Sequence, residues 1–226
     1  SSTKLLTSCA MIMLAEEGRI RWDDPVEVYI PELGQRSVLK PGAQSIDEVE
    51  PARSPITLRH LMTHTSGLSY GIFDPGTVMY KAYQQAAVMH PGKNLAEMMR
   101  VLATLPLNFH PGTQWEYSVA TDVLGRVVEV VSGESFGSFL SRRIFQPLGM
   151  HDTDFWVPPA KQDRLCKLYV GVDLLDPRKP GLLRADDKPY PGAYSHPAIR
   201  ESGGGGLVST LGDTIKFIQS LLPGGP

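Results

Sequence analysis

The chain has 226 residues, of which 42% are hydrophobic and 20% charged, values typical of a globular protein rather than a disordered or membrane-embedded one. Its net charge of −2 provides no basic surface of the kind that binds nucleic acid or an anionic membrane, so neither partner is expected. No run of sequence approaches the ~20 apolar residues that span a bilayer.

The first segment, "SSTKLLTSCAMIMLAEEGRI", predicts a helix from Ser1 to about Glu17, with Gly18 as its stop. Four apolar residues recur at helical spacing and form the face that we expect in the core: Leu5, Cys9, Ile12 and Met13. Ser1 and Lys4 are three residues apart, so both side chains share one helical face, with Cβ atoms ~5–6 Å apart. A lysine amine can therefore reach a serine hydroxyl, although Ser-x-x-Lys alone is a short pattern that recurs by chance.

The next part of the chain predicts short helices separated by loops. Residues 35–55 are polar, contain three prolines and indicate a surface excursion. Thr57 can cap a short helix that ends by Gly67, and a loop rich in Gly, Pro and Tyr then extends to His90. Apolar periodicity predicts the next helix over residues 95–105.

The second half begins with a Pro-Gly loop, "NFHPGTQWEYS", that delivers Trp115 and Tyr117 to a helix over residues 119–131. Residues 135–150 predict another helix, and residues 158–200 predict a long ordered loop or short strands over a pocket. The final helix is expected from about Leu211, because Thr210 and Asp213 have capping-box spacing.

Tyr117 is the second candidate catalytic group. An ammonium within ~4–6 Å lowers the pKa of a phenol, so a Tyr117 beside Lys4 would titrate with it as a pair, and the sequence leaves open which group holds the proton. Their joint role would be to accept the proton of Ser1. Trp115, Tyr70 and Tyr194 are candidates to line an acyl pocket, although aromatic residues in such loops are as often plain packing.

Two other motifs point to different chemistry. "GESFG" matches the Gly-x-Ser-x-Gly of an α/β-hydrolase, with Ser135 as nucleophile and Asp152 and His196 as later partners. The apolar residues before it continue a helical pattern, which favours Ser135 as a helix cap. His60 and His64 have the i, i+4 spacing of a zinc helix but lack its glutamate, so no metal is expected and His64 is interpreted as fixing a loop.

Five motifs, in order and spacing, resemble the serine β-lactamase-like superfamily, and within it the class C-like (family VIII) carboxylesterases and related acyltransferases: "SSTKLL", "ITLRHLMTHTSGLSY", "PLNFHPGTQWEYSVATDVLGRVVEVVSG", "IFQPLGMHDTDF" and "SGGGGLVSTLGDTIKFI". The resemblance implies an α/β fold in which a helical region packs on an antiparallel sheet, with this chain covering mainly the helical part. We expect one such domain over residues 1–226, incomplete at both ends.

The resemblance also assigns roles to residues. It makes Ser1 the acylated nucleophile, Lys4 its base partner and Tyr117 the proton-transfer residue, and it brings the backbone of Gly204 and Gly205 close to the substrate. Position 119 is Val where β-lactamases usually have Asn, which favours esters over β-lactams. The family's third motif is expected beyond residue 226.

The sequence therefore predicts a serine hydrolase that cleaves small-molecule carboxylic esters through an acyl-serine intermediate and needs no cofactor. An alcohol in place of water would make it an acyltransferase. A β-lactamase or D-Ala peptidase, an α/β-hydrolase using Ser135, and a non-catalytic binding domain remain as alternatives. Cys9 and Cys166 are too few for a disulfide framework, which is compatible with a reducing, cytoplasmic compartment, and the oligomeric state is not indicated.

Overall fold

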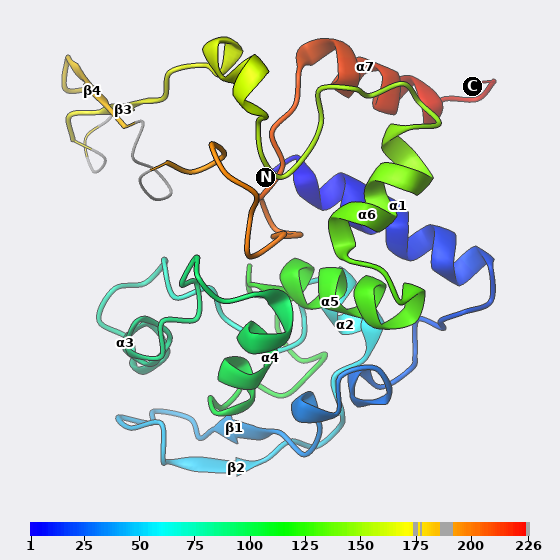
Figure 1. The fold of residues 1–226 in the computed structure, drawn as a ribbon. Helices are drawn as coiled ribbons and strands as arrows, with labels where there is room; N and C mark the ends of the chain where they lie inside the picture. Colours follow the sequence, from blue (N-terminus) through cyan, green and yellow to red (C-terminus); the bar gives the residue numbers. More distant parts are fainter. Residues whose placement is uncertain (174–175, 177, 186–191, 225–226) are drawn as a thin grey trace.

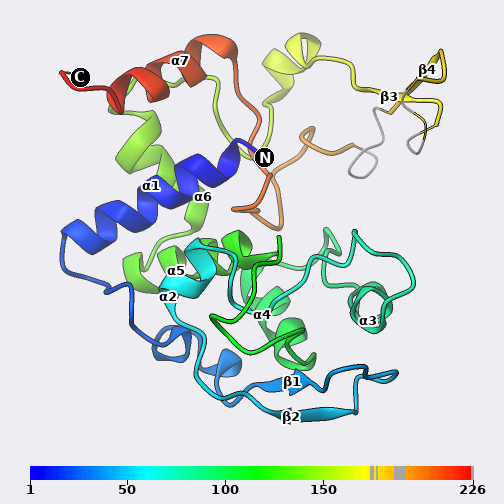
Figure 2. The same cartoon turned by 180° about the vertical axis from the view of Figure 1, so that it is seen from behind.

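The computed structural model describes residues 1–173, 176, 178–185 and 192–224, and its ribbon is shown in Figures 1 and 2. The α-helices are α1 (Thr3–Glu16), α2 (Leu58–Met62), α3 (Val78–Gln85), α4 (Leu95–Ala103), α5 (Ala120–Ser132), α6 (Phe136–Leu140) and α7 (Leu211–Ser220). The strands are β1 (Ser37–Leu39), β2 (Val49–Pro51), β3 (Tyr169–Gly171) and β4 (Leu182–Arg184). Short 3₁₀ segments cover Val26–Val28, Pro31–Leu33 and Pro159–Arg164, and a π-helical turn covers Ser141–Phe145.

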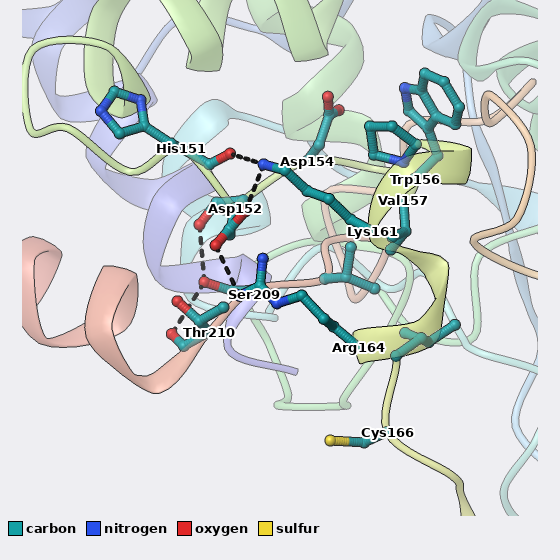
Figure 3. Close-up of a pocket in the computed structure, with 14 residues that line it drawn as sticks. His151, Asp152, Asp154, Trp156, Val157, Lys161, Arg164, Cys166, Ser209 and Thr210 are labelled. Atoms are coloured by element: carbon teal, nitrogen blue, oxygen red, sulfur yellow. Dashed lines mark hydrogen bonds and ion pairs between the residues drawn. The ribbon is translucent and has the colours of Figure 1, made fainter.

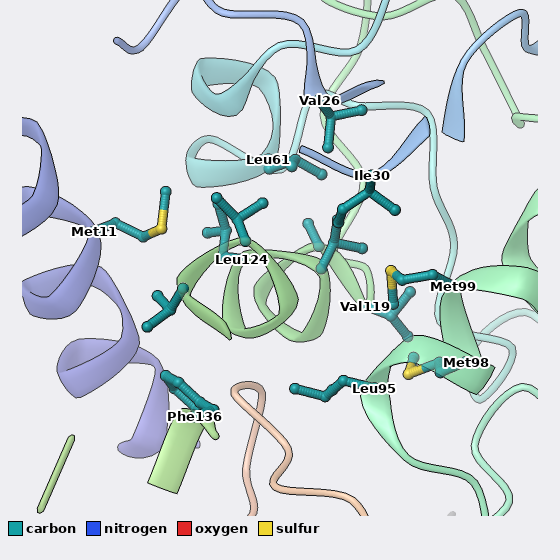
Figure 4. Packing of buried hydrophobic residues seen from close by; sticks show 14 of the residues in the cluster. Met11, Val26, Ile30, Leu61, Leu95, Met98, Met99, Val119, Leu124 and Phe136 are labelled. Carbon is teal, nitrogen blue, oxygen red and sulfur yellow. The ribbon is translucent and has the colours of Figure 1, made fainter. Parts of the chain in front are cut away.

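Helix α5 is the centre of the hydrophobic core. It contacts α1, α2, α4 and α6, whose apolar side chains surround it (Figure 4). Leu95 and Phe136 pack directly against the backbone of α5 at Gly125, because a Cβ there would lie 3.4 Å from Leu95 and 3.5 Å from Phe136. The start of α5 is therefore held rigidly from several sides, and Tyr117 lies just before it.

Local signals set the ends of several helices as predicted. Gly133 ends α5 in the left-handed region at φ 76°, which favours glycine. Thr210 begins α7 by accepting a hydrogen bond from the Asp213 backbone N–H at 3.2 Å, and Asn94 caps α4 in the same way through Glu97. The helices predicted over 95–105 and 119–131, and from Leu211, are confirmed.

The buried face of α1 was predicted wrongly. Leu5 and Ile12 are 58% and 44% exposed, and Cys9 and Met13 are only partly buried. The buried residues of α1 are instead Thr3, Leu6, Thr7, Ala10, Met11 and Leu14. Apolar residues occur on nearly every side of this helix, so periodicity alone does not select a face. Thr3 and Thr7 are buried because their hydroxyls make hydrogen bonds, which a search for apolar residues does not detect.

Residues 35–55 form more than a surface excursion. Strands β1 and β2 pair antiparallel in this region, with Val38 opposite Glu50 and buried. Arg36, which is 8% exposed, donates to the carbonyls of Leu102 and Ala103 at 2.8 and 2.7 Å and so binds the C-terminal end of α4. The hairpin was missed because three-residue strands carry too little alternation to detect.

Two further differences concern short elements. Helix α3 lies within the stretch that was predicted to be a loop, where Thr77 caps it by accepting from the Tyr80 N–H at 3.2 Å. Helix α2 stops at Met62, earlier than the predicted end at Gly67. Strands β3 and β4 form a second small antiparallel pair, as the expectation of short strands over 158–200 allowed.

The N-terminus of α1 lies beside the segment that precedes α7 in both views of the ribbon (Figures 1 and 2). That segment contains the four consecutive glycines, Gly203 to Gly206. In the part of the chain that the structure describes, none of the helices combines the length and apolar composition needed to cross a bilayer.

Candidate active site

Three groups that are far apart in sequence meet at the start of α1. The Ser1 Oγ lies 3.0 Å from the Tyr117 phenol oxygen, and the Lys4 Nζ donates to the Ser1 Oγ at 3.3 Å. The same Nζ lies 4.9 Å from the centre of the Tyr117 ring and donates to the Gly204 carbonyl. The structure thus brings together the hydroxyl, the amine and the phenol that the sequence predicted.

This meeting follows from how α1 and α5 are placed. Ser1 lies just before α1 and Lys4 is on its first turn, so the helix fixes their separation. Tyr117 ends a loop whose backbone is tied down on the way to α5: the Gly112 N–H donates to Thr65 O at 2.8 Å, and the Glu116 N–H to His64 O at 3.0 Å. Because α1 packs on α5, the two ends carrying these side chains come together.

The surroundings of Tyr117 favour the ionised form of its phenol. Partial burial opposes the ionised form, but hydrogen bonds from Lys4 and Ser1, together with the Lys4 charge, outweigh it and lower the pKa of Tyr117 from its ordinary value. A lowered pKa increases the fraction of phenolate present. Tyr117 and Lys4 are both in contact with the Ser1 hydroxyl.

His64 makes the hydrogen bonds of a loop-fixing residue, as predicted, and the segment that it fixes is the one that carries Tyr117. Its Nδ1 lies 3.2 Å from the Ser118 Oγ and accepts from the Ser118 backbone N–H at 3.3 Å, while its ring lies 5.0 Å from the Tyr117 ring. Burial, and secondarily the Lys4 charge, lowers the pKa of His64. Its backbone is in the left-handed region at φ 54°, which ends α2 sharply.

The glycine segment approaches α1 and α5 closely. A Cβ on Gly203 would lie 2.4 Å from the Thr121 carbonyl, and one on Gly204 would lie 2.9 Å from the Asp122 carboxylate. The Gly203 carbonyl accepts from the Thr7 hydroxyl at 2.9 Å. Gly205 has open space around its Cβ position. The two glycines predicted to bind substrate therefore differ, because Gly204 is fixed beside Lys4 whereas a Cβ on Gly205 would meet none of the described residues within 4 Å.

The predicted aromatic residues occupy different positions. Tyr70 stacks on Tyr117, with ring centres 5.5 Å apart and planes inclined by 11°. Trp115 is 67% exposed, with its ring 6.4 Å from that of His64. Tyr194 lies on the segment before α7, where its carbonyl accepts from the Val157 N–H at 2.6 Å. Substrate binding by these residues stays a prediction.

Sequence reasoning missed two residues at this site. Phe73 is 54% exposed and packs edge-on against both Tyr117 and Tyr70, at 6.0 and 6.2 Å between ring centres. Asp122 is fully buried on the first turn of α5 and receives a hydrogen bond from the Ser202 hydroxyl at 2.6 Å. The available signal for Asp122 was an acidic residue among the mostly apolar residues 119–125. Phe73 had none, because nothing in its loop predicts where the ring points.

The residues of the α/β-hydrolase alternative do not form a catalytic arrangement. Ser135 follows helix α5 rather than a strand, and its hydroxyl accepts from the Ser138 N–H at 3.2 Å as the cap of α6. Asp152 forms ion pairs with Lys161 and Arg164 in a separate pocket (Figure 3), and these partners hold the pKa of its carboxyl well below the usual range. In the "GESFG" motif, Gly133 therefore ends α5 and Ser135 begins α6.

His60 is also structural. Its backbone N–H donates to the Thr57 hydroxyl and its Nδ1 accepts from the Thr57 N–H, both at 3.2 Å, which completes a capping box on α2. Among the described residues, no cluster of three or more His, Cys, Asp or Glu side chains is arranged to hold a metal ion.

Comparison with known proteins identifies the family of this chain. The sequence model of the beta-lactamase family matches residues 1–225. The chain belongs to the beta-lactamase family. It is 35% identical over 223 residues to a protein described as lovastatin esterase from Penicillium rubens, and 30% identical over 233 residues to esterase EstB from Burkholderia gladioli. These matches cover 98% of this chain in both cases.

The fold agrees with this family. A solved structure described as EstCE1, a hydrolase with promiscuous acyltransferase activity, superimposes with a TM-score of 0.75 at 26% identity over 98% of this chain and 57% of that protein. The β-lactamase-like fold expected from the sequence is thus confirmed, with helices and small antiparallel strands in the described part. The chain spans about half the length of the curated relatives that it matches, 54% of the lovastatin esterase and 55% of EstB.

Proposed function

We propose that this chain carries the nucleophile and the proton-transfer groups of a serine esterase. The observation that carries the proposal is the contact of the Ser1 hydroxyl with both Tyr117 and Lys4, at 3.0 and 3.3 Å. Membership of a family that includes esterases supports hydrolysis or acyl transfer as the reaction class.

The proposed reaction has two halves. The Ser1 Oγ attacks the ester carbonyl carbon while the Tyr117–Lys4 pair accepts its proton, and the same pair returns that proton to the departing alcohol, leaving an acyl-serine. In the second half, water is deprotonated by the pair and attacks the acyl carbon, which releases the carboxylic acid and restores the Ser1 hydroxyl. One water is consumed and one ester bond is broken in each cycle.

Esters are favoured over β-lactams by Val119. This position is buried, and its side chain has no amide group to donate to or accept from a lactam or peptide bond. Transfer to an alcohol is a second candidate, because the same groups would activate an acceptor hydroxyl in place of water, and the relative EstCE1 is described as having promiscuous acyltransferase activity.

The test is labelling of the natural protein with a fluorophosphonate probe, followed by mass mapping of the modified serine. We expect a single adduct on Ser1, abolished in Ser1→Ala and retained in Ser135→Ala. Turnover of p-nitrophenyl butyrate should exceed that of nitrocefin. An adduct on Ser135, or no adduct at all with a folded protein, would contradict the proposal, and faster nitrocefin turnover would favour a β-lactamase.

A further inference from the structure

Asp122 is a buried carboxyl group that the proposed mechanism does not use. It lies on the first turn of α5, five residues after Tyr117, and is 0% exposed. One oxygen, Oδ1, accepts from the Ser202 hydroxyl at 2.6 Å, whereas Oδ2 makes no hydrogen bond of ordinary geometry with the described residues. Burial raises the pKa of the Asp122 carboxyl group, and the Ser202 hydroxyl and the nearby Gly204 backbone N–H oppose this effect. A buried carboxyl group is costly to retain, so its position calls for a physical explanation.

The carboxyl group faces the glycine segment at the point where that segment meets Lys4. The Oδ2 lies 2.9 Å from the position that a Cβ of Gly204 would occupy, and the carbonyl of the same Gly204 accepts from the Lys4 Nζ. Ser202, two residues earlier, is held by Oδ1. Asp122 therefore fixes residues 202–204 on one side, and the Gly204 carbonyl fixes Lys4 on the other side.

Three contacts from α1 hold the same segment from the opposite direction. The Thr7 hydroxyl donates to the Gly203 carbonyl at 2.9 Å, and the Thr3 hydroxyl accepts from the Leu207 N–H at 3.2 Å. The third contact is the one from Lys4 itself. The segment is thus clamped between α1 and α5, and Asp122 supplies the side-chain hydrogen bond from the α5 side.

We propose that Asp122 is a positioning residue that holds residues 202–204 so that the Gly204 carbonyl keeps the Lys4 Nζ in contact with Ser1 and Tyr117. Fixing a flexible four-carbon side chain such as that of Lys4 costs conformational entropy. An acceptor that is already in place holds the Lys4 side chain in the one conformation that reaches Ser1 and Tyr117. This inference rests on the proposed function, since it assigns Asp122 to the alignment of the proton-transfer pair.

Several other groups surround Tyr117. Lys4 reaches it from α1 and His64 from the loop after α2, while Tyr70 stacks on it from the loop before α3. Asp122 acts on Tyr117 from α5 in the opposite sense to Lys4, because a carboxylate charge raises the pKa of the phenol. The positional and the purely electrostatic effects of removing Asp122 therefore have opposite signs, which makes them separable.

The experiment measures the rate constant for fluorophosphonate labelling of Ser1 against pH in the natural protein and in Asp122→Ala. We expect labelling at least ten-fold slower at pH 7. We also expect the pH of half-maximal rate to move upward, because a Tyr117 without a fixed Lys4 returns towards its ordinary pKa. An unchanged rate, an unchanged midpoint or a midpoint moved to lower pH would overturn the proposal.

Two conservative variants sharpen the result. Asp122→Asn keeps an oxygen that accepts from Ser202, so its rate loss should be smaller than that of Asp122→Ala and its midpoint should not move upward. Ser202→Ala removes the bond to Oδ1 and should move the midpoint upward, which keeps the test decisive if Asp122→Ala does not fold. An Asn variant as slow as the Ala variant, or an unmoved Ser202→Ala midpoint, would count against positioning.

Asp213→Ala is the matched control. Asp213 is 5% exposed on α7, and its carboxylate accepts from the Asp152 N–H at 2.8 Å and the Thr153 hydroxyl at 3.0 Å. Asp213→Ala should lower the stability of the protein and leave the pH of half-maximal labelling rate unchanged. If this pH moves as far in Asp213→Ala as in Asp122→Ala, the effect of Asp122→Ala is explained by general destabilisation. If the wild type is labelled and all variants are labelled at the same rate, only the positioning role of Asp122 is contradicted. Unlabelled wild type would sink the proposed function.

Discussion

At the scale of single residues, the phenol oxygen of Tyr117 is the shortest link to the Ser1 hydroxyl, at 3.0 Å. Its pKa is lowered because the contacts with Lys4 and Ser1 outweigh partial burial. A lowered pKa increases the fraction of Tyr117 present as phenolate, which is the form that can accept the serine proton. Removing one oxygen atom therefore tests the proposed role directly.

Tyr117→Phe should lower kcat for p-nitrophenyl butyrate by about 10²- to 10⁴-fold, the range for loss of a positioned proton-transfer group, with a small change in KM. Steady-state kinetics measures this. Tyr29→Phe is the control, since the Tyr29 phenol donates to Asp24 at 2.6 Å in a structural contact, and its activity should stay at the wild-type level. A Tyr117→Phe enzyme with wild-type kcat would remove Tyr117 from the mechanism.

His64 makes a second residue-scale prediction, on pH and stability. Burial lowers the pKa of His64 in the folded protein below the ordinary 6.5. At a pH between the folded-state pKa and 6.5, the unfolded chain therefore binds a proton that the folded chain does not. The free energy of unfolding should therefore fall as pH drops below about 6.5. Urea unfolding at pH 8 and pH 5 should show a larger loss in the wild type than in His64→Asn, which tolerates the left-handed backbone. Equal losses would contradict this.

At the scale of secondary-structure elements, the glycine segment decides how closely α1 and α5 can be bridged. Gly203 lies against the Thr121 carbonyl, whereas Gly205, two residues on, has none of the described residues within 4 Å of its Cβ position. The same residue type therefore has different consequences at the two positions. Sequence alone treats the four glycines as equivalent.

Gly203→Ala should destabilise the protein by about 1–3 kcal/mol, because a Cβ placed 2.4 Å from backbone must displace the segment. Gly205→Ala, the matched control, should change stability by no more than about 0.5 kcal/mol. Urea unfolding of both variants measures the difference. Equal stabilities would show that the clamped arrangement of residues 203 and 204 is not tight.

At the scale of the whole molecule, the packing around α5 determines whether the site exists at all. Phe136 is fully buried against this helix, and its ring lies 5.7 Å from that of Phe155, which follows the ion-paired Asp152 by three residues. Loss of this packing would loosen α5, and with it the position of Tyr117 relative to Ser1. Stability and labelling of Ser1 should therefore fall together.

Phe136→Ala should cost about 3–5 kcal/mol of unfolding free energy, the usual range for a buried Phe replaced by Ala. Leu182→Ala, at a side chain that is 70% exposed on β4, should cost less than about 0.5 kcal/mol. Thermal melts followed by circular dichroism compare the two. A Phe136→Ala protein that melts at the wild-type temperature would show that this contact does not contribute to the core.

The sequence by itself determined the local features. Gly133 ends α5 and Ser135 starts α6 because left-handed backbone and side-chain capping depend only on near neighbours. Spacing within one helix likewise determined that Lys4 would lie beside Ser1. Ordered motifs predicted that Tyr117 would join them. These features needed no knowledge of which elements pack together.

Only the tertiary structure decided which face of α1 is buried, that Phe73 lies beside Tyr117, and that Asp122 lies beside the glycine segment. Leu5 and Ile12 satisfy the helical period as well as Leu6 and Met11 do, so the choice between the two faces depends on where α5 lies. The neighbours of the buried Asp122 carboxyl group are Ser202 and Gly204, some eighty residues further along the chain. Contacts at such separation are set by the packing of the whole chain, which no local pattern encodes.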